Sequence, residues 1–430
     1  MMAFIVSLVC TSCQEEGITS EEVSSEDSSI HMKRSYDEAL AIAQESLSML
    51  DDAKTRSGQK RTIDLSNTQY VLSNRTRSGQ DTLDTLLYVF NFADDAGYAV
   101  ISTNAAATGL LAITEAGNYN ETELKKNGGL ALFIEKAKVY SRGGHLIEPG
   151  LNPFVDTLSS VLIEYVNPLI EVTWGQCFPE GLYCPNTIAG CTNTATAQIA
   201  SYFEYPTQLQ LDFAQADSSS VTLNWTAMKQ HIRGSSSCIS HNNCTASVEA
   251  HKNIGRLCRQ CAYYNMSSFY KDSLFIFTSS PLPHDYYSYT AYISDGTYTR
   301  TAESYTGTAL LAFGYSVTST IYYFPKCTQT YLDNGWPIIM CGLDNPDKGH
   351  TWVADGYKYY EDTLLSYITP LPSIITQYRY YNHFNWGWDG SSNGYFYDGV
   401  FNSSNAYTYD TSPSSQVHSY SDIILSAVHR

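Results

Sequence analysis

A cysteine stands at the start of an Ala- and Thr-rich segment whose apolar residues have helical spacing. Residues 190–206 read GCTNTATAQIASYFEYP, with Cys191 directly after a glycine. Ala195, Ile199 and Phe203 recur along one side, and a proline ends the segment. The first turn of a helix carries the positive end of the macrodipole, which favours a thiolate. The segment therefore predicts a helix with Cys191 as a candidate nucleophile; a small, buried structural cysteine is the alternative.

A cysteine nucleophile needs a histidine base and a group that fixes the histidine tautomer. His350 opens an apolar strand bounded by glycines at 349–356, after a second predicted strand at 336–340. Asn385 precedes two tryptophans in FNWGWDG, and its amide oxygen suits an imidazole N–H. His383 is the competing base, but in an extended strand it shares a face with Asn385 and is poorly placed to be oriented by it. The expected base is therefore His350.

The four blocks WGQ, GCTNTATAQIASYFEYP, GHTWVADGY and NWGWDG occur in this order along the chain. Together they resemble the streptopain family of secreted bacterial cysteine peptidases. The similar region runs from about residue 168 to about residue 400. The resemblance implies an α+β fold class, in which a papain-like catalytic domain has a helical part and an antiparallel β part.

The resemblance also implies a role for each residue of the site. Cys191 is the expected nucleophile, His350 the general base and acid, and Asn385 the residue that orients the imidazole. Gln176 is expected to donate its side-chain amide to the oxyanion hole, and Trp386 to shield the histidine–asparagine contact. No metal or cofactor is expected. The expected substrate-binding residues are Gly335, Gly349 and Trp388.

The chain departs from the family pattern at three places. Thr192 and Asn193 stand where relatives have two small or apolar residues, and Asp389 stands where a glycine is usual. Residues 357–380 lengthen the connection between the histidine and asparagine strands. These departures leave one alternative function open, a catalytically idle relative that acts as a surface binding or inhibitor lipoprotein. A second alternative is an acyltransferase that uses the same Cys–His chemistry.

The first residues of the chain predict export. Residues 1–13 are the expected signal peptide: residues 1–9 are apolar and too short to span a bilayer, and small residues precede Cys13, as in bacterial lipoprotein signal peptides. We therefore expect lipidation at Cys13 and a membrane anchor on a secreted or cell-surface protein of a bacterium. A plain secretory signal with an incidental cysteine is the alternative. Residues 14–34 are acidic and Ser-rich, which predicts a disordered tether.

Residues 35–150 predict a small α+β unit. Ser35 and Glu38 form a capping box at the start of a helix, a β-hairpin is expected at 88–102, and a second helix at about 130–140. This unit resembles the family's propeptide, which implies a zymogen whose own propeptide inhibits it until it is cut. A permanent accessory domain that needs no cut is the alternative.

The cut is expected between Ser141 and Pro153, in a stretch that contains glycine and proline, so that residues 151–430 form the catalytic domain. The expected partners are protein and peptide substrates. The net charge of −18 and the lack of a Lys/Arg run argue against binding to nucleic acid.

The cysteine count suits an oxidising compartment. Of the eleven cysteines, eight remain after Cys10, Cys13 and Cys191 are set aside, enough for four disulfides. Cys258 and Cys261 have the spacing of a zinc or redox motif, but no second pair lies nearby. Their apolar helical setting favours buried thiols instead.

Overall fold

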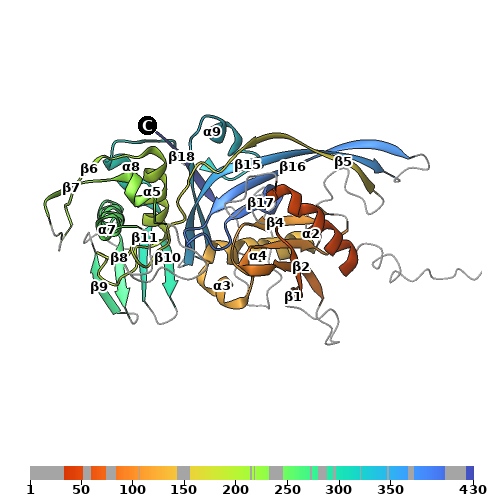
Figure 1. Ribbon diagram of the computed structural model, residues 1–430, viewed down its shortest axis with the longest axis horizontal. Coiled ribbons are helices and arrows are strands. Elements are labelled where there is room, and N and C mark those ends of the chain that lie inside the picture. Colours follow the sequence, from red (N-terminus) through yellow and green to blue (C-terminus); the bar gives the residue numbers. More distant parts are fainter. Residues whose placement is uncertain are drawn as a thin grey trace, which may run out of the picture.

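The computed structural model contains one long joined β-sheet with helices packed around it (Figure 1). It describes residues 33–51, 60–73, 84–105, 107–142, 155–213, 216, 218–231, 246–271, 274–278, 288–293, 297–319, 321–345, 348–366, 372–401 and 423–430. In these parts of the chain, no helix has the length and apolar character that crossing a membrane requires.

The first elements form a group that we call the N-terminal unit. Its elements are α2 (Tyr36–Asp51), β1 (Ile63–Leu72), β2 (Thr85–Phe92), η2 (Ala93–Asp95), β3 (Tyr98–Ser102), β4 (Leu110–Thr114), α3 (Glu121–Lys126) and α4 (Gly128–Ser141). The predicted capping box starts α2, because the Ser35 amide donates to Glu38 Oε2 at 2.7 Å and the Glu38 amide donates to Ser35 Oγ at 3.3 Å. The predicted hairpin is β2–β3.

The remaining elements form the part of the chain that is expected to be catalytic, called the catalytic unit below, and this unit has two parts. The helical part contains α5 (Cys191–Phe203), β6 (Gln208–Gln210), β7 (Ser220–Thr222), α6 (Trp225–Met228), α7 (Val248–Tyr264), β8 (Ser268–Lys271), β9 (Leu274–Thr278), β10 (Ser288–Ile293), β11 (Thr297–Ala302), η4 (Glu303–Tyr305) and α8 (Thr308–Ala312). The β part contains β5 (Val155–Val166), β12 (Ser316–Val317), β13 (Ile321–Tyr322), α9 (Gln329–Asp333), β14 (Ile338–Asn345), β15 (Lys348–Ser366), β16 (Ser373–Asn385), β17 (Gly394–Tyr397), η5 (Asp398–Phe401) and β18 (Ile424–His429). The predicted fold class is therefore confirmed: an α+β chain with a helical and an antiparallel β part behind a small α+β unit.

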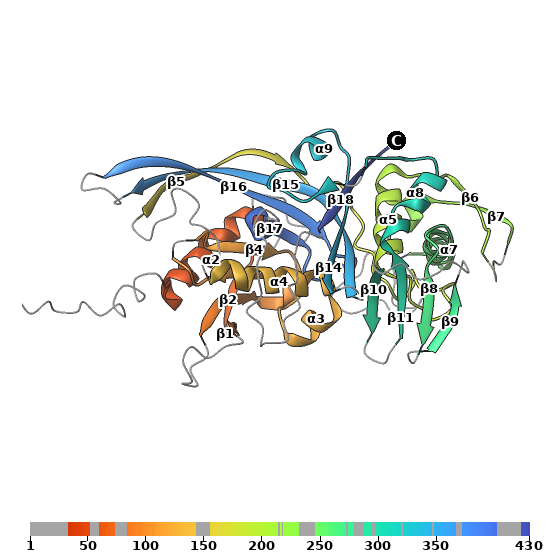
Figure 2. The same ribbon diagram turned by 180° about the vertical axis from the view of Figure 1, so that it is seen from behind.

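The sheets of the two units are continuous. The strand order is β1-β2-β3-β4-β17-β16-β15-β14-β18-β12, so β4 of the N-terminal unit pairs with β17 of the catalytic unit. In this antiparallel junction Gly394 lies opposite Thr114, and Phe396 lies opposite Ala112. The view from behind shows β4 and β17 side by side, with α4 close to them (Figure 2).

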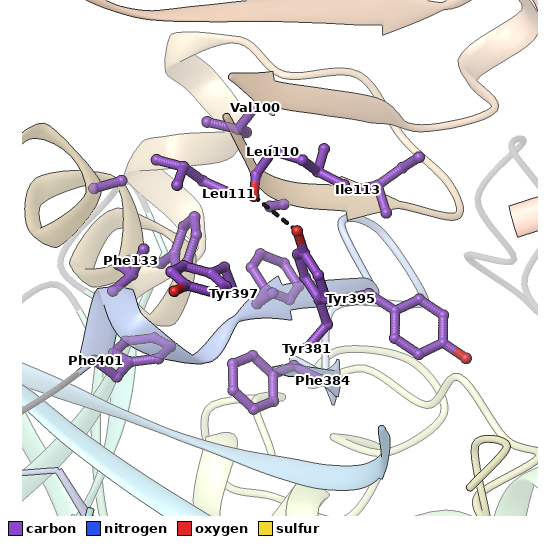
Figure 3. Close-up of a cluster of buried hydrophobic side chains, with 14 of the residues drawn as sticks. Val100, Leu110, Leu111, Ile113, Phe133, Tyr381, Phe384, Tyr395, Tyr397 and Phe401 are labelled. Carbon is purple, nitrogen blue, oxygen red and sulfur yellow. Dashed lines mark hydrogen bonds between the residues drawn. The ribbon is translucent and has the colours of Figure 1, made fainter. Parts of the chain in front are cut away.

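The hydrophobic core beneath this junction belongs to both units. Phe133 of α4 packs edge-to-face on Phe396 of β17, with ring centroids 4.9 Å apart. The Tyr381 hydroxyl donates to the Leu110 carbonyl at 3.2 Å, across the boundary between the units (Figure 3). Truncating a buried phenylalanine such as Phe133 typically costs about 3–5 kcal/mol. The two units are therefore held together by core packing as well as by the sheet.

β15 separates two cores, because alternate side chains of a strand point to opposite faces. Trp352 and Ala354 belong to the core shared with the N-terminal unit. Val353 belongs to a second core, built around α5 and α7. The strand therefore has the N-terminal unit on one face and the cysteine helix on the other.

A three-stranded arm extends from the sheet, above α2 (Figure 1). Its central strand β15 pairs with β16 on one side and β5 on the other. The arm contains the extra length at 357–380, and it carries exposed apolar side chains such as Leu158, Val161 and Ile374.

Candidate active site

Cys191 is the first residue of α5, as predicted. The preceding residue, Gly190, has φ +92°, and a Cβ there would lie 2.9 Å from Thr299 Cγ2, so only glycine fits this approach. Cys191 is 2% exposed. Burial raises the pKa of its thiol, although hydrogen bonds from Thr351 and Thr192 oppose the rise. In this state the thiol is therefore protonated, and burial outweighs the expected effect of the helix start.

The residue of β15 that meets the cysteine helix is Thr351, whose hydroxyl lies 3.0 Å from the Thr192 hydroxyl. His350 is the neighbour of Thr351 on an extended strand, so it points to the other face, toward the N-terminal unit. The nucleophile–base contact that we predicted between Cys191 and His350 is not made in this structure.

His350 is instead bonded to a backbone carbonyl. Its Nε2 lies 2.8 Å from the carbonyl oxygen of Trp386, and the side chain is buried. Burial lowers the pKa of His350 to about 4, although the Trp386 carbonyl opposes this effect. The imidazole is therefore neutral at pH 7, and its Nε2–H is donated to Trp386. Rings of Trp352, Trp386 and Trp388 surround it, with centroids 6.3, 6.4 and 6.1 Å away.

The first turn of α4 closes this aromatic site. A Cβ built on Gly129 would lie 2.4 Å from the Trp386 ring and 2.7 Å from His350 Cδ2, so the helix backbone lies directly against both side chains. Asn127 caps the helix, because its side chain accepts from the Leu130 amide at 3.0 Å. The N-terminal unit therefore covers the predicted base.

Asn385 is held by the cysteine helix rather than by His350. Its Oδ1 accepts from Gln198 Nε2 at 3.0 Å, and its Nδ2 donates to the Val172 carbonyl at 3.0 Å. Sequence reasoning missed Gln198. The available signal was its position seven residues after Cys191, which places both residues on one face of the helix.

Gln176 is completely buried. Its two amide atoms have no hydrogen-bond partner among the described residues. Its backbone is fixed beside the nucleophile, because its carbonyl accepts from the Ala189 amide at 2.8 Å, two residues before Cys191. A buried amide without a partner costs free energy, and such groups are typically kept for a functional reason.

The competing histidine, His383, is part of a charge cluster. Its Nδ1 lies 2.6 Å from Asp355 Oδ1, and its Nε2 lies 3.6 Å from Glu115 Oε1 of the N-terminal unit. Burial alone lowers the pKa of His383, but the two carboxylates outweigh it and raise the pKa to about 10. His383 is therefore a charged residue at the boundary of the two units.

The departures from the family pattern fit the fold. Asn193 is buried and satisfied: its Nδ2 donates to the Ala189 carbonyl and to Ser267 Oγ, and its Oδ1 accepts from Asn265. The Asp389 carboxylate packs against the backbone of Gly175, in the space that a side chain at position 175 would need: a Cβ there would lie 2.2 Å from Oδ1. Neither residue replaces a group of the predicted site.

Two of the three predicted substrate-binding residues lie beside His350, and the third does not. Trp388 is next to His350. Gly349 precedes the histidine on β15, opposite Leu343. Gly335 has φ +72° and lies near Tyr202 of α5.

The seven described cysteines form no disulfide with one another, so the disulfides that the count allows do not form among them. Cys258 and Cys261 are buried in α7, as predicted, and burial raises the pKa of both thiols. No group of three or more His, Cys, Asp or Glu side chains in the described ranges could hold a metal ion. Cys13, Cys238 and Cys244 lie outside the described residues.

A thiol hydrolase with a built-in inhibitor is expected to have a cysteine on a helix start, a nearby buried glutamine amide and a histidine covered by a separate unit, and this chain has all three. Comparison with known families gives the same class. Residues 171–396 match the peptidase C10 family, and residues 24–140 match the Spi protease inhibitor family. The chain belongs to the peptidase C10 family, which is the streptopain family that the sequence resembles.

Among solved structures, a fragment of prointerpain A from Prevotella intermedia is similar at 18% identity, with a TM-score of 0.48. The alignment covers 84% of this chain and 98% of that fragment. No curated protein matches the sequence. The two family matches make the protein a cysteine peptidase of zymogen organisation, with protein substrates and an inhibitory propeptide in the same chain.

Proposed function

We propose that this protein is a cysteine endopeptidase in which Cys191 is the nucleophile and His350 the general base and acid. The observation that carries the proposal is the buried side-chain amide of Gln176, which has no hydrogen-bond partner among the described residues. The backbone of Gln176 is bonded to Ala189, two residues before the cysteine helix begins. Such a donor suits an oxyanion, because it becomes satisfied only when the tetrahedral intermediate forms.

Activation requires the imidazole to change faces. His350 lies two residues after the start of β15, next to Gly349, and a shift of one residue at this end of the strand reverses which side chain faces α5. Once α4 leaves, the shift brings His350 to the place that Thr351 occupies here. The thiol and imidazole then form a thiolate–imidazolium pair.

Catalysis then follows in two stages. The Cys191 thiolate attacks the peptide carbonyl, while Gln176 and the Cys191 backbone N–H bind the oxyanion. His350 protonates the leaving amine, and it later takes a proton from the water that hydrolyses the acyl-enzyme. Asn385, already oriented by Gln198, accepts the imidazole N–H, and Trp386 covers that bond.

The test compares the wild type with Cys191→Ala and with Cys327→Ala, a matched loss of a buried thiol at a remote place. Wild type and Cys327→Ala are expected to hydrolyse casein and to process themselves between residues 141 and 153, and Cys191→Ala is expected to do neither. Mass spectra give the cut. Proteolysis by Cys191→Ala contradicts the proposal, whereas cross-linked products without new carboxyl termini would identify an acyltransferase.

We further propose that the protein is exported and attached to a bacterial membrane through Cys13. The support is the sequence of residues 1–13 alone. Incorporation of a labelled fatty acid into the wild type, and its loss in Cys13→Ser, is the expected result. Equal labelling of both contradicts a lipid at this residue.

A further inference from the structure

Glu180 is a carboxylate in the interior of the helical part. It is 0% exposed, and its Oε1 accepts from the backbone N–H of Gly175 at 3.1 Å. His231 Nε2 lies 3.7 Å from the same oxygen, and this histidine is buried as well. A carboxylate without exposure needs hydrogen bonds and an opposite charge to be retained in a fold. The backbone N–H of Gly175, to which Glu180 is bonded, therefore indicates what this carboxylate supports.

The partner belongs to the segment that carries Gln176. The cysteine helix already fixes the carbonyls of this segment, because Gln198 Nε2 donates to Trp174 and Thr194 Oγ1 donates to Gly175, both at 2.8 Å. Glu180 adds the bond to the Gly175 N–H. A hydrogen bond to a charged acceptor is stronger than a neutral one, so it holds the peptide before Gln176 more firmly.

We propose that Glu180 is a positioning residue for the oxyanion hole. It does not touch the substrate. It holds the peptide unit before Gln176, so that the amide of Gln176 stays where the oxyanion forms. The inference rests on the proposed function, because it assigns a support to the same Cys191–Gln176 site.

The test uses three variants of the full chain, each studied after processing. Glu180→Asp keeps the charge but withdraws the carboxylate from the Gly175 N–H by one methylene. Glu180→Gln keeps both length and an acceptor oxygen. Glu171→Asp is the matched control, since the Glu171 side chain is 76% exposed and lies outside the cluster.

Glu180→Asp is expected to lower kcat roughly tenfold, less than the hundredfold or more of a lost oxyanion donor, with KM nearly unchanged. Glu180→Gln is expected to restore kcat to within about threefold of the wild type. A peptide aldehyde forms an adduct on Cys191 that places an oxygen in the oxyanion hole. Its affinity for Glu180→Asp should fall by the same factor as kcat/KM. Alkylation of Cys191 by an epoxide inhibitor should keep its rate.

A kcat of Glu180→Asp equal to that of the control overturns the inference. An equal loss in the aldehyde and epoxide reactions also overturns it, because Cys191 itself would then have moved. Both results leave the proposed function intact if Cys191→Ala is inactive. Wild-type protein without peptidase activity would instead remove the proposed function.

Discussion

Gly129 is a residue at which the N-terminal unit packs directly on the predicted base. Its missing side chain lets the α4 backbone lie on His350 and Trp386, at distances that no Cβ could share. The neighbouring residue Gly128 is less constrained, since its Cβ would lie 3.6 Å from His350 Cβ, an ordinary contact. The close packing of α4 on His350 therefore needs a glycine at position 129 but not at position 128.

We predict that Gly129→Ala opens the inhibited state, because overpacking at a close contact typically costs about 1–3 kcal/mol. The intact chain should process itself about five- to a hundredfold faster, at roughly 1.4 kcal/mol per tenfold. Gly128→Ala is the matched control and should process at the wild-type rate. The measurement is the time course of the uncut band on a gel, and equal rates for the two variants would count against closure by Gly129.

Residue patterns predicted the cysteine helix, the β2–β3 hairpin and the strand that carries His350, because each depends on neighbours in sequence. The face of β15 to which His350 points could not be predicted in this way, because it depends on the register of β15 in the whole sheet. The hydrogen bond between Gln198 and Asn385 could not be predicted either, because the two residues are 187 positions apart in the sequence and only the fold brings them together.

At the scale of elements, the N-terminal unit contacts His350 and Trp386 through the first turn of α4. The turn begins at Asn127, whose side-chain oxygen satisfies the Leu130 amide. A helix that loses such a cap frays at its first turn. In this chain the first turn is the part that covers His350.

Asn127→Ala is therefore expected to speed self-processing by several-fold, because loss of an N-cap costs about 1 kcal/mol. Asn224→Ala supplies the matched control: Asn224 caps α6 through the Ala227 amide at 3.0 Å, within the catalytic unit. It should lower thermal stability to a similar degree without faster processing. Acceleration in both variants would mean that general destabilisation, and not the α4 turn, limits the reaction.

At the scale of the whole molecule, the two units share a sheet, a core and a buried charge cluster. Glu115 belongs to the N-terminal unit, whereas His383 and Asp355 belong to the catalytic unit. The folded pKa of His383, about 10, is above the unfolded value of about 6.5. Its contribution to stability is thus fully present below pH 6.5 and is lost as the pH rises through about 10.

We predict that His383→Gln lowers the Tm of the intact chain most at pH 6 and least above pH 10, where the wild-type imidazole has lost most of its charge. Glu115→Gln should show the same trend with a smaller difference, since Asp355 remains beside the histidine. Scanning calorimetry across this range provides the measurement. A Tm difference that is constant with pH would show that the histidine acts by packing alone.

Because β4 pairs with β17, we expect that a nicked chain is not active at once. Cutting the connection after α4 breaks one covalent bond, but it leaves the ladder between Thr114 and Gly394 and the aromatic contact of Phe133 in place. Dissociation must follow as a separate event, and it uncovers the backbone donors and acceptors of β17 along a free sheet edge. The cut in the chain and the onset of peptidase activity are therefore expected to be separated in time, by an interval that depends on dilution.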